Sequence, residues 1–254
     1  MYYIVLDLEF NQSYPFKNGS VVPPLPQCPF EIIQIGAVKL NEAFEIIEEF
    51  DAFIKPEIYP RLHPYVEKIT GIKADQLADK ASFKSVYADF TNFIGTKDAI
   101  LCTWGNDDIK ALFRNILHHK LDPDQITQKY INVQTHASTF LKHEKGKAIG
   151  LKNATVELEI ETDIPFHNAL CDAIYTAKVF ALVHPEEITP SHFRPLTLLV
   201  NTTKAPKTNT PALLQHVSDV MERELTAEER KLIKMAYVLG RAHAFDASVV
   251  KRKK

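Results

Sequence analysis

Cysteine is scarce in this sequence, and its spacing excludes a metal site built from paired thiolates. The chain has three cysteines, Cys28, Cys102 and Cys171, an odd number of widely separated residues. None of them forms the C-x-x-C spacing that is typical of a zinc site. We therefore predict reduced thiols.

Long apolar runs and an excess of one charge are also missing. No run approaches the roughly 18 apolar residues of a membrane-spanning helix, and no basic region precedes the first apolar run. We therefore expect a soluble, cytoplasmic protein with no membrane partner. The formal net charge is −2, so a nucleic-acid partner would be held by a local patch or through metal ions rather than by the field of the whole protein.

The first ten residues combine a strand-forming apolar run with two acids. Asp7 and Glu9 are two residues apart, so their side chains leave the same face of a strand. Two such carboxylates repel each other unless a cation lies between them, and oxygen ligands of this kind suit magnesium or manganese. For an isolated pair, a solvated strand end is the commoner explanation. Their position on an otherwise buried strand favours a metal site that the rest of the chain must complete.

Apolar periodicity predicts a sheet flanked by helices, which is an α/β fold. A short connection joins the second and third strand-like runs as a hairpin, so three strands follow one another at the start of the chain. The proline-rich segment 11–29 between the first two is a loop that either overhangs the acids or is an inert insertion. The strand-like runs are 1–10, 31–40, 44–54, 99–103 and 130–133, and the longer helical runs include 82–94, the segment after 105, 134–142 and 169–183.

Two neighbouring aspartates open the helix after residue 105. At about 100° per residue, its apolar face is centred near Ile109, which turns Asp107 away from the core and leaves Asp108 at the flank. We therefore choose Asp108 as the third metal ligand and Asp107 as a solvated or capping acid. Helix capping is the alternative for either residue.

A further acid and a histidine occur in the apolar segment 164–183. The helix from 169 onward is apolar nearly all round, with Tyr175 and Lys178 as its outward residues. An uncompensated anion at Asp172 would be costly there, so Asp172 is the candidate fourth ligand. His167 lies five residues earlier and is a candidate base. Without the other acids, a capping or surface role would be the better interpretation of this histidine.

Two aromatic residues and a basic cluster have two interpretations each. Phe10 and Trp104 stand beside predicted metal ligands. If the partner is a nucleic acid, their rings are candidates for stacking on its terminal nucleobase. Core packing is the better interpretation of Trp104, and the two are even for Phe10. The basic residues of 142–147, with Lys152 beyond, are either a solvated helix end or, if they face the acids, a site for phosphates.

The C-terminal part differs in composition from the rest. Residues 185–211 are rich in proline and threonine, which predicts a linker or an extended strap. Two helices are expected over 212–224 and 226–244, the second opened by a capping box at 226–229. We therefore divide the chain into a domain at 1–184, a linker at 185–211 and a helical extension at 212–254. The apolar side of the extension is expected to pack on the domain, to self-associate or to bind a protein partner.

The acids and the histidine occur in an order and in local settings that resemble a known family. Residues 2–184 are similar to the DEDDh 3′-to-5′ exonucleases of the ribonuclease H-like superfamily, and particularly to the enhanced-RNAi and histone-mRNA exonuclease branch with its bacterial KapD-type members. That branch has a small residue followed by Thr-Cys after the first acids, where this chain has Phe10-Asn-Gln-Ser. The motifs that carry the resemblance are Asp7-Leu-Glu-Phe, Pro29-Phe-Glu-Ile-Ile, Phe53-Ile-Lys-Pro, Ile69-Thr-Gly-Ile, Thr103-Trp-Gly-Asn-Asp-Asp and His167-Asn-Ala-Leu-Cys-Asp172.

The resemblance implies a ribonuclease H-like fold, with a mixed five-stranded sheet whose first three strands are antiparallel. It also implies two divalent ions, Mg²⁺ or Mn²⁺, held by Asp7, Glu9, Asp108 and Asp172, with neutral His167 taking the proton of the attacking water. The expected activity is 3′-to-5′ removal of nucleoside 5′-monophosphates from single-stranded nucleic acid, RNA favoured. Two alternatives stay open: an exonuclease for single-stranded DNA, and a regulatory binding protein with an idle nuclease site, which the complete set of acids disfavours.

Overall fold

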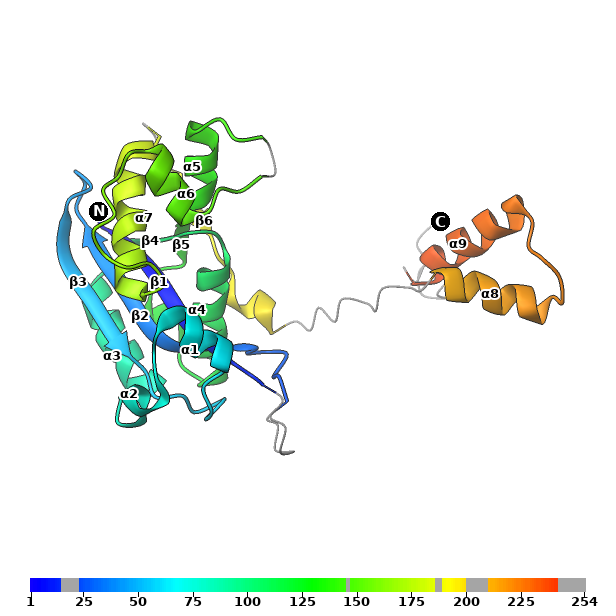
Figure 1. The fold of residues 1–254 in the computed structure, drawn as a ribbon, viewed down its shortest axis with the longest axis horizontal. Helices are drawn as coiled ribbons and strands as arrows, with labels where there is room; N and C mark the ends of the chain where they lie inside the picture. The colour runs from blue at the N-terminus through cyan, green and yellow to red at the C-terminus, as the bar shows by residue number, and fades with distance from the viewer. Residues whose placement is uncertain (15–22, 145–146, 186–188, 200–209, 242–254) are drawn as a thin grey trace, which may run out of the picture. The chain divides into compact units, whose positions relative to one another are not determined.

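The computed structural model describes residues 1–14, 23–144, 147–185, 189–199 and 210–241 (Figure 1). The chain divides into two compact units, Met1–Val200 and Asn201–Lys254. In the described part of the chain, no helix has both the length and the apolar character needed to cross a membrane.

The first unit is built on a mixed six-stranded sheet with the order β3-β2-β1-β4-β5-β6. β2 runs antiparallel to its neighbours β1 and β3, β4 runs parallel to β1, and β5 runs parallel to β4. The predicted mixed sheet is therefore confirmed, with a two-residue sixth strand added at the β5 edge. The strands are β1 Tyr3–Gln12, β2 Phe30–Leu40, β3 Ile46–Phe53, β4 Ile100–Thr103, β5 Lys129–Asn132 and β6 Ser191–His192.

Helices pack on both faces of this sheet (Figure 1). The side chains of β1 alternate between these two faces. Ile4, Leu6 and Leu8 are buried in a core with α3 and α4. Tyr3 and Val5 are buried in a second core with α5, α6 and α7. Asp7 and Glu9 continue the row of Tyr3 and Val5, so they leave the sheet on the α7 side. The helices are α1 Pro64–Thr70, α2 Ala74–Ala78, α3 Phe83–Ile94, α4 Asp107–His118, α5 Val133–Phe140, α6 Leu151–Glu157 and α7 Ala169–Val183, with short 3₁₀ turns η1 Pro123–Gln125 and η2 Pro195–Leu198.

Part of the segment that the sequence assigns to a linker belongs to the first unit. Strand β6 pairs with β5, and the Phe193 N–H donates to Gln128 O at 2.8 Å. The Phe193 ring stacks on Phe113, with 5.0 Å between ring centroids. The first unit accordingly runs to Val200 instead of ending at residue 184. Of the two interpretations of 185–211, the strap describes residues 191–198.

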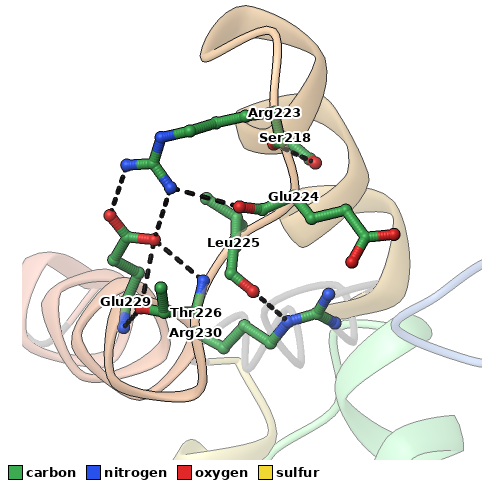
Figure 2. Close-up of polar contacts among 7 residues, drawn as sticks. All are labelled: Ser218, Arg223, Glu224, Leu225, Thr226, Glu229 and Arg230. Atoms are coloured by element: carbon green, nitrogen blue, oxygen red, sulfur yellow. Dashed lines mark hydrogen bonds and ion pairs between the residues drawn. The ribbon is translucent and has the colours of Figure 1, made fainter.

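The second unit contains α8 Thr210–Val220 and α9 Ala227–Arg241. Polar contacts fix the turn between these two helices (Figure 2). The Arg223 guanidinium donates to both carboxylate oxygens of Glu229, at 2.9 and 2.6 Å. Thr226 and Glu229 exchange the two hydrogen bonds of a capping box, which confirms that prediction. The basic tail 251–254 lies outside the described residues.

Candidate active site

Three of the four predicted metal ligands meet above β1. Asp7 and Glu9 lie on β1, and Asp172 lies in the first turn of α7, which packs across β1 and β2 (Figure 1). One carboxylate oxygen from each of the three lies within 4.8 Å of the others. All three side chains are partly buried. The strand pattern that puts both β1 acids on the α7 side therefore delivers them to a third acid from a distant part of the sequence.

The close approach of α7 to the sheet depends on Gly36. This glycine pairs with Asp7 across the β1–β2 ladder. A Cβ atom added at Gly36 would lie 2.0 Å from the backbone nitrogen of Leu170 and 2.1 Å from the carbonyl carbon of Ala169. Because backbone atoms cannot give way as a flexible side chain does, only glycine lets the first turn of α7 rest on β2 at this height.

A buried glutamine ties the same turn of α7 to the sheet. Gln34 stands opposite Glu9 in the ladder and is fully buried. Its Nε2 donates to Asp51 Oδ1 at 2.8 Å, and its Oε1 accepts from the Ala169 N–H at 3.4 Å. Sequence reasoning missed both Gln34 and Gly36. Their signal is a polar residue and a glycine inside the otherwise apolar run of β2.

Asp108 and Asp107 are separated as the helical phase predicts. Asp108 is 8% exposed in the first turn of α4. The Asp107 side chain is 96% exposed and forms an ion pair with Lys110 at 3.1 Å. Asp108 stands outside the group of three acids whose oxygens lie within 4.8 Å of one another. Burial raises the pKa of Asp7 most, and the negative charge of Asp108 raises it further.

Burial raises the pKa of all four acids, and repulsion from neighbouring carboxylates raises it further for Asp7, Glu9 and Asp108. Burial, followed by the charge of Asp172, raises the pKa of Glu9 to about 7. Burial, followed by the charges of Asp107 and Glu9, raises the pKa of Asp108 to about 8. Burial and the neighbouring carboxylates hold the pKa of Asp7 well above its usual range. The cluster therefore retains protons near neutral pH unless a cation compensates its charge.

The donor atoms of the cluster fit a divalent metal ion. Asp172 Oδ2 accepts a hydrogen bond from the backbone N–H of His167 at 3.2 Å. Asp172 Oδ1 is buried and has no hydrogen-bond partner among the described residues. A buried carboxylate oxygen without a donor is costly, and a cation would satisfy it. An all-oxygen set of carboxylates is the ligand chemistry of Mg²⁺ and Mn²⁺.

His167 lies in the loop that leads into α7, and its side chain is exposed. Its backbone has a φ of 66°, in the left-handed region that few residues other than glycine adopt. Burial raises the pKa of Asp172. The hydrogen bond from the His167 backbone N–H and the charge of a protonated imidazole both act to lower it. The residue that follows, Asn168, caps α7 by accepting from the N–H groups of Leu170 and Cys171. The loop thus brings His167 to the acids, and its role as a base stays a prediction.

Tyr175 corrects the sequence analysis, which places it on the outward side of α7. The residue is fully buried. Its hydroxyl bonds to the backbone of Ile164, and its ring stacks on Phe166. The prediction failed because the loop before α7 folds back over this side of the helix. Lys178 remains partly exposed, 4.0 Å from Asp163.

The candidate substrate contacts stay predictions. Phe10 and Trp104 are both partly buried against the two cores, and the Phe10 ring lies 5.9 Å from that of Phe30. In the basic cluster, residues 145–146 lie outside the described residues, and Lys147 forms an ion pair with Glu144 at 2.6 Å. Lys152 is the member beside the His167 loop, with its Nζ 5.9 Å from the centre of the Phe166 ring.

Comparisons with known proteins find similarity to exonucleases. A family model described as "Exonuclease" matches residues 4–180. The probable 3′-5′ exonuclease KapD of Bacillus subtilis is 25% identical over 185 residues, which cover 72% of this chain and 85% of KapD. A PolC-type DNA polymerase III of Thermotoga petrophila is 32% identical over 193 residues, which cover 70% of this chain and 13% of the polymerase. The nuclease domain of 3′hExo, a DEDDh family member bound to rAMP, shares the fold with a TM-score of 0.63 at 23% identity, covering 76% of this chain and 97% of that domain.

Proposed function

Because this chain belongs to the exonuclease family, and is therefore a hydrolase of phosphodiester bonds in nucleic acids, we propose that it shortens single-stranded nucleic acid from the 3′ end. The product is a nucleoside 5′-monophosphate, and RNA is the favoured substrate. The observation that carries the proposal is the convergence of Asp7, Glu9 and Asp172 within 4.8 Å, with the buried Asp108 electrostatically coupled to them.

Two divalent cations, Mg²⁺ or Mn²⁺, are the proposed cofactors. Asp7, Glu9, Asp108 and Asp172 would hold them, and Asp172 Oδ1 is the oxygen that most needs a cation. When bound, the ions would neutralise the carboxylates and polarise the scissile phosphate. The carboxylates then act in their ionised form, against the raised pKa values that burial gives them.

His167 is the proposed general base. It lies beside Asp172 and is exposed, so water and a nucleic-acid end both have access to it. An imidazole accepts a proton only in its neutral form, so the rate is expected to rise with pH until the histidine is deprotonated. The left-handed backbone conformation at His167 sets the direction in which its side chain leaves the chain just before α7.

RNA and DNA are the two substrate classes to be separated. The resemblance to the enhanced-RNAi and histone-mRNA branch favours RNA, and the 3′hExo nuclease domain was solved with a ribonucleotide. The similarity to a PolC-type DNA polymerase keeps single-stranded DNA as the alternative.

Matched oligonucleotides test the proposal. RNA and DNA of one sequence are incubated with the protein and Mg²⁺, and the released mononucleotides are identified by mass spectrometry. We expect nucleoside 5′-monophosphates, released faster from RNA. Faster release from DNA would reassign the substrate, whereas nucleoside 3′-monophosphates or internal fragments would contradict 3′-to-5′ exonuclease chemistry.

A further inference from the structure

The segment that carries His167 is irregular and partly exposed, yet the proposed chemistry requires the imidazole in a defined place. Residues 161–168 form no helix or strand, and His167 itself has the strained φ of 66°. Burial therefore does not position this side chain. A positive φ is uncommon for residues other than glycine, so contacts around the segment help to hold this conformation.

Tyr175 supplies the firmest hold on this segment. Its hydroxyl accepts from the Ile164 N–H at 2.9 Å and donates to the Ile164 carbonyl oxygen at 2.7 Å. Its ring stacks on Phe166, the residue before His167, with 4.7 Å between centroids and 25° between planes. Tyr175 is fully buried, and its two hydrogen bonds to Ile164 are partly buried.

Further contacts hold both ends of the same segment against α7. Lys178 lies 4.0 Å from Asp163 and places its Nζ 5.5 Å from the centre of the Tyr175 ring. The backbone N–H of His167 donates to Asp172 at the other end. Each of these partners belongs to α7, so the segment is fastened to one helix along its length.

The same helix carries a predicted metal ligand and the anchor of the predicted base. Tyr175 follows Asp172 by three residues, about one helical turn, so the two side chains lie on neighbouring parts of the same face. Any shift of α7 moves the acid and the histidine segment together. The distance between them is set by the helix rather than by the flexible chain.

We propose that Tyr175 is a positioning residue for His167, holding the base in place through Ile164 and Phe166. This inference rests on the proposed function. A misplacement of about 1 Å at a catalytic group can lower a rate by about a hundredfold. Loss of the Tyr175 hydroxyl is therefore expected to lower kcat while leaving KM and the metal concentration for half-maximal rate close to those of the wild type.

A double-mutant cycle on the full chain tests the inference. The rates of RNA shortening are compared for wild type, Tyr175→Phe, His167→Ala and the double variant. We expect Tyr175→Phe to lower kcat about tenfold or more in the wild-type background and to have no further effect in the His167→Ala background. Phe166→Leu keeps the Tyr175 hydroxyl and removes the ring that stacks on Tyr175. It is also expected to lower kcat when His167 is present and to have no further effect in the His167→Ala background.

Tyr87→Phe is the matched control. Tyr87 is also fully buried, and its hydroxyl donates to a backbone carbonyl, that of Asp122, at 2.9 Å. Its loss is expected to lower the unfolding temperature without a selective fall in kcat. Equal losses from Tyr175→Phe with and without His167 would indicate a general structural role and overturn the inference.

The same experiment separates this inference from the function on which it rests. If His167→Ala loses activity while Tyr175→Phe keeps it, the positioning role is wrong and the exonuclease proposal stands. If the wild type shortens neither RNA nor DNA with Mg²⁺ or Mn²⁺, both are wrong. If Tyr175→Phe fails to fold, Phe166→Leu decides the outcome.

Discussion

The acids of the site keep their protons to a higher pH in the folded chain than in the unfolded one. Burial raises the pKa of Glu9 from its ordinary 4.5 to about 7, and that of Asp108 from 3.8 to about 8. A group with a raised folded-state pKa contributes stability that is complete below the unfolded pKa. That stability is lost as pH rises through the folded pKa, because the unfolded state releases its proton first.

We predict that the metal-free protein becomes less stable as pH rises from about 4.5 to 7, the window set by Glu9. The decline is expected to continue toward pH 8 through Asp108. Thermal unfolding in EDTA at a series of pH values measures it, and Glu9→Gln is expected to make the decline shallower. Mg²⁺ should raise the unfolding temperature more at pH 8 than at pH 5, because protonated acids hold no cation. An unfolding temperature in EDTA that rises across this window would contradict the account.

Two adjacent aspartates provide a matched pair at the residue scale. We predict that Asp108→Asn lowers the rate by at least about a hundredfold, because one of the proposed metal ligands, a buried one, would be lost. Asp107→Asn should leave the rate near that of the wild type, since that side chain is 96% exposed. Equal rates for the two variants would remove Asp108 from the site.

At the scale of elements, the site depends on how closely α7 approaches β2. We predict that Gly36→Ala destabilises the protein by about 1–3 kcal/mol, because its Cβ would overlap the backbone of α7. The rate should fall with it, since Asp172 would move away from Asp7. Gly150→Ala is the control, because a Cβ there has no atom within 4 Å. Unfolding in urea and the rate of RNA shortening measure both effects.

The elements that the sequence predicts well are those with a clear internal period. The apolar phase of α4 separates Asp108 from Asp107 without knowledge of any partner, and the alternation of β1 puts Asp7 and Glu9 on one face. Gln34 and Gly36 were missed because their roles exist only when α7 packs on β2. No local pattern announces a contact between residues that are so far apart in sequence.

Two other differences have the same cause. Tyr175 looks outward on an isolated helix, and only the returning loop at 164–166 buries it. Residues 191–198 lie in the segment 185–211, whose many prolines and threonines indicate a linker, yet Phe193 packs on Phe113 and Tyr130. In each case a tertiary contact outweighs the local signal.

For the whole molecule, the boundary between the two units leads to a comparison of two truncations. We predict that a chain ending at Val200 keeps the rate and unfolding temperature of the full protein, because the first unit retains its own core. A chain ending at Pro190 loses β6 and Phe193, and its unfolding temperature should fall by at least about 4 °C.

The second unit is proposed to serve self-association or a protein partner. Light scattering of the full chain and of the chain ending at Val200 tests self-association. Self-association would be supported if the full chain forms an oligomer and the chain ending at Val200 contains fewer copies or is a monomer. An unchanged monomer in both would leave a protein partner as the remaining proposal for α8 and α9.

The most direct test of the central claim is the shortening of a 5′-labelled single-stranded RNA by the wild type and by Asp7→Asn. The account predicts a ladder that shortens from the 3′ end with Mg²⁺ or Mn²⁺, that disappears in EDTA, and that is lost in the variant. Asparagine keeps the shape of the residue and removes the charge that would hold the cation. A full ladder from Asp7→Asn, or a wild-type ladder that persists in EDTA, would contradict a metal-dependent site built on these acids.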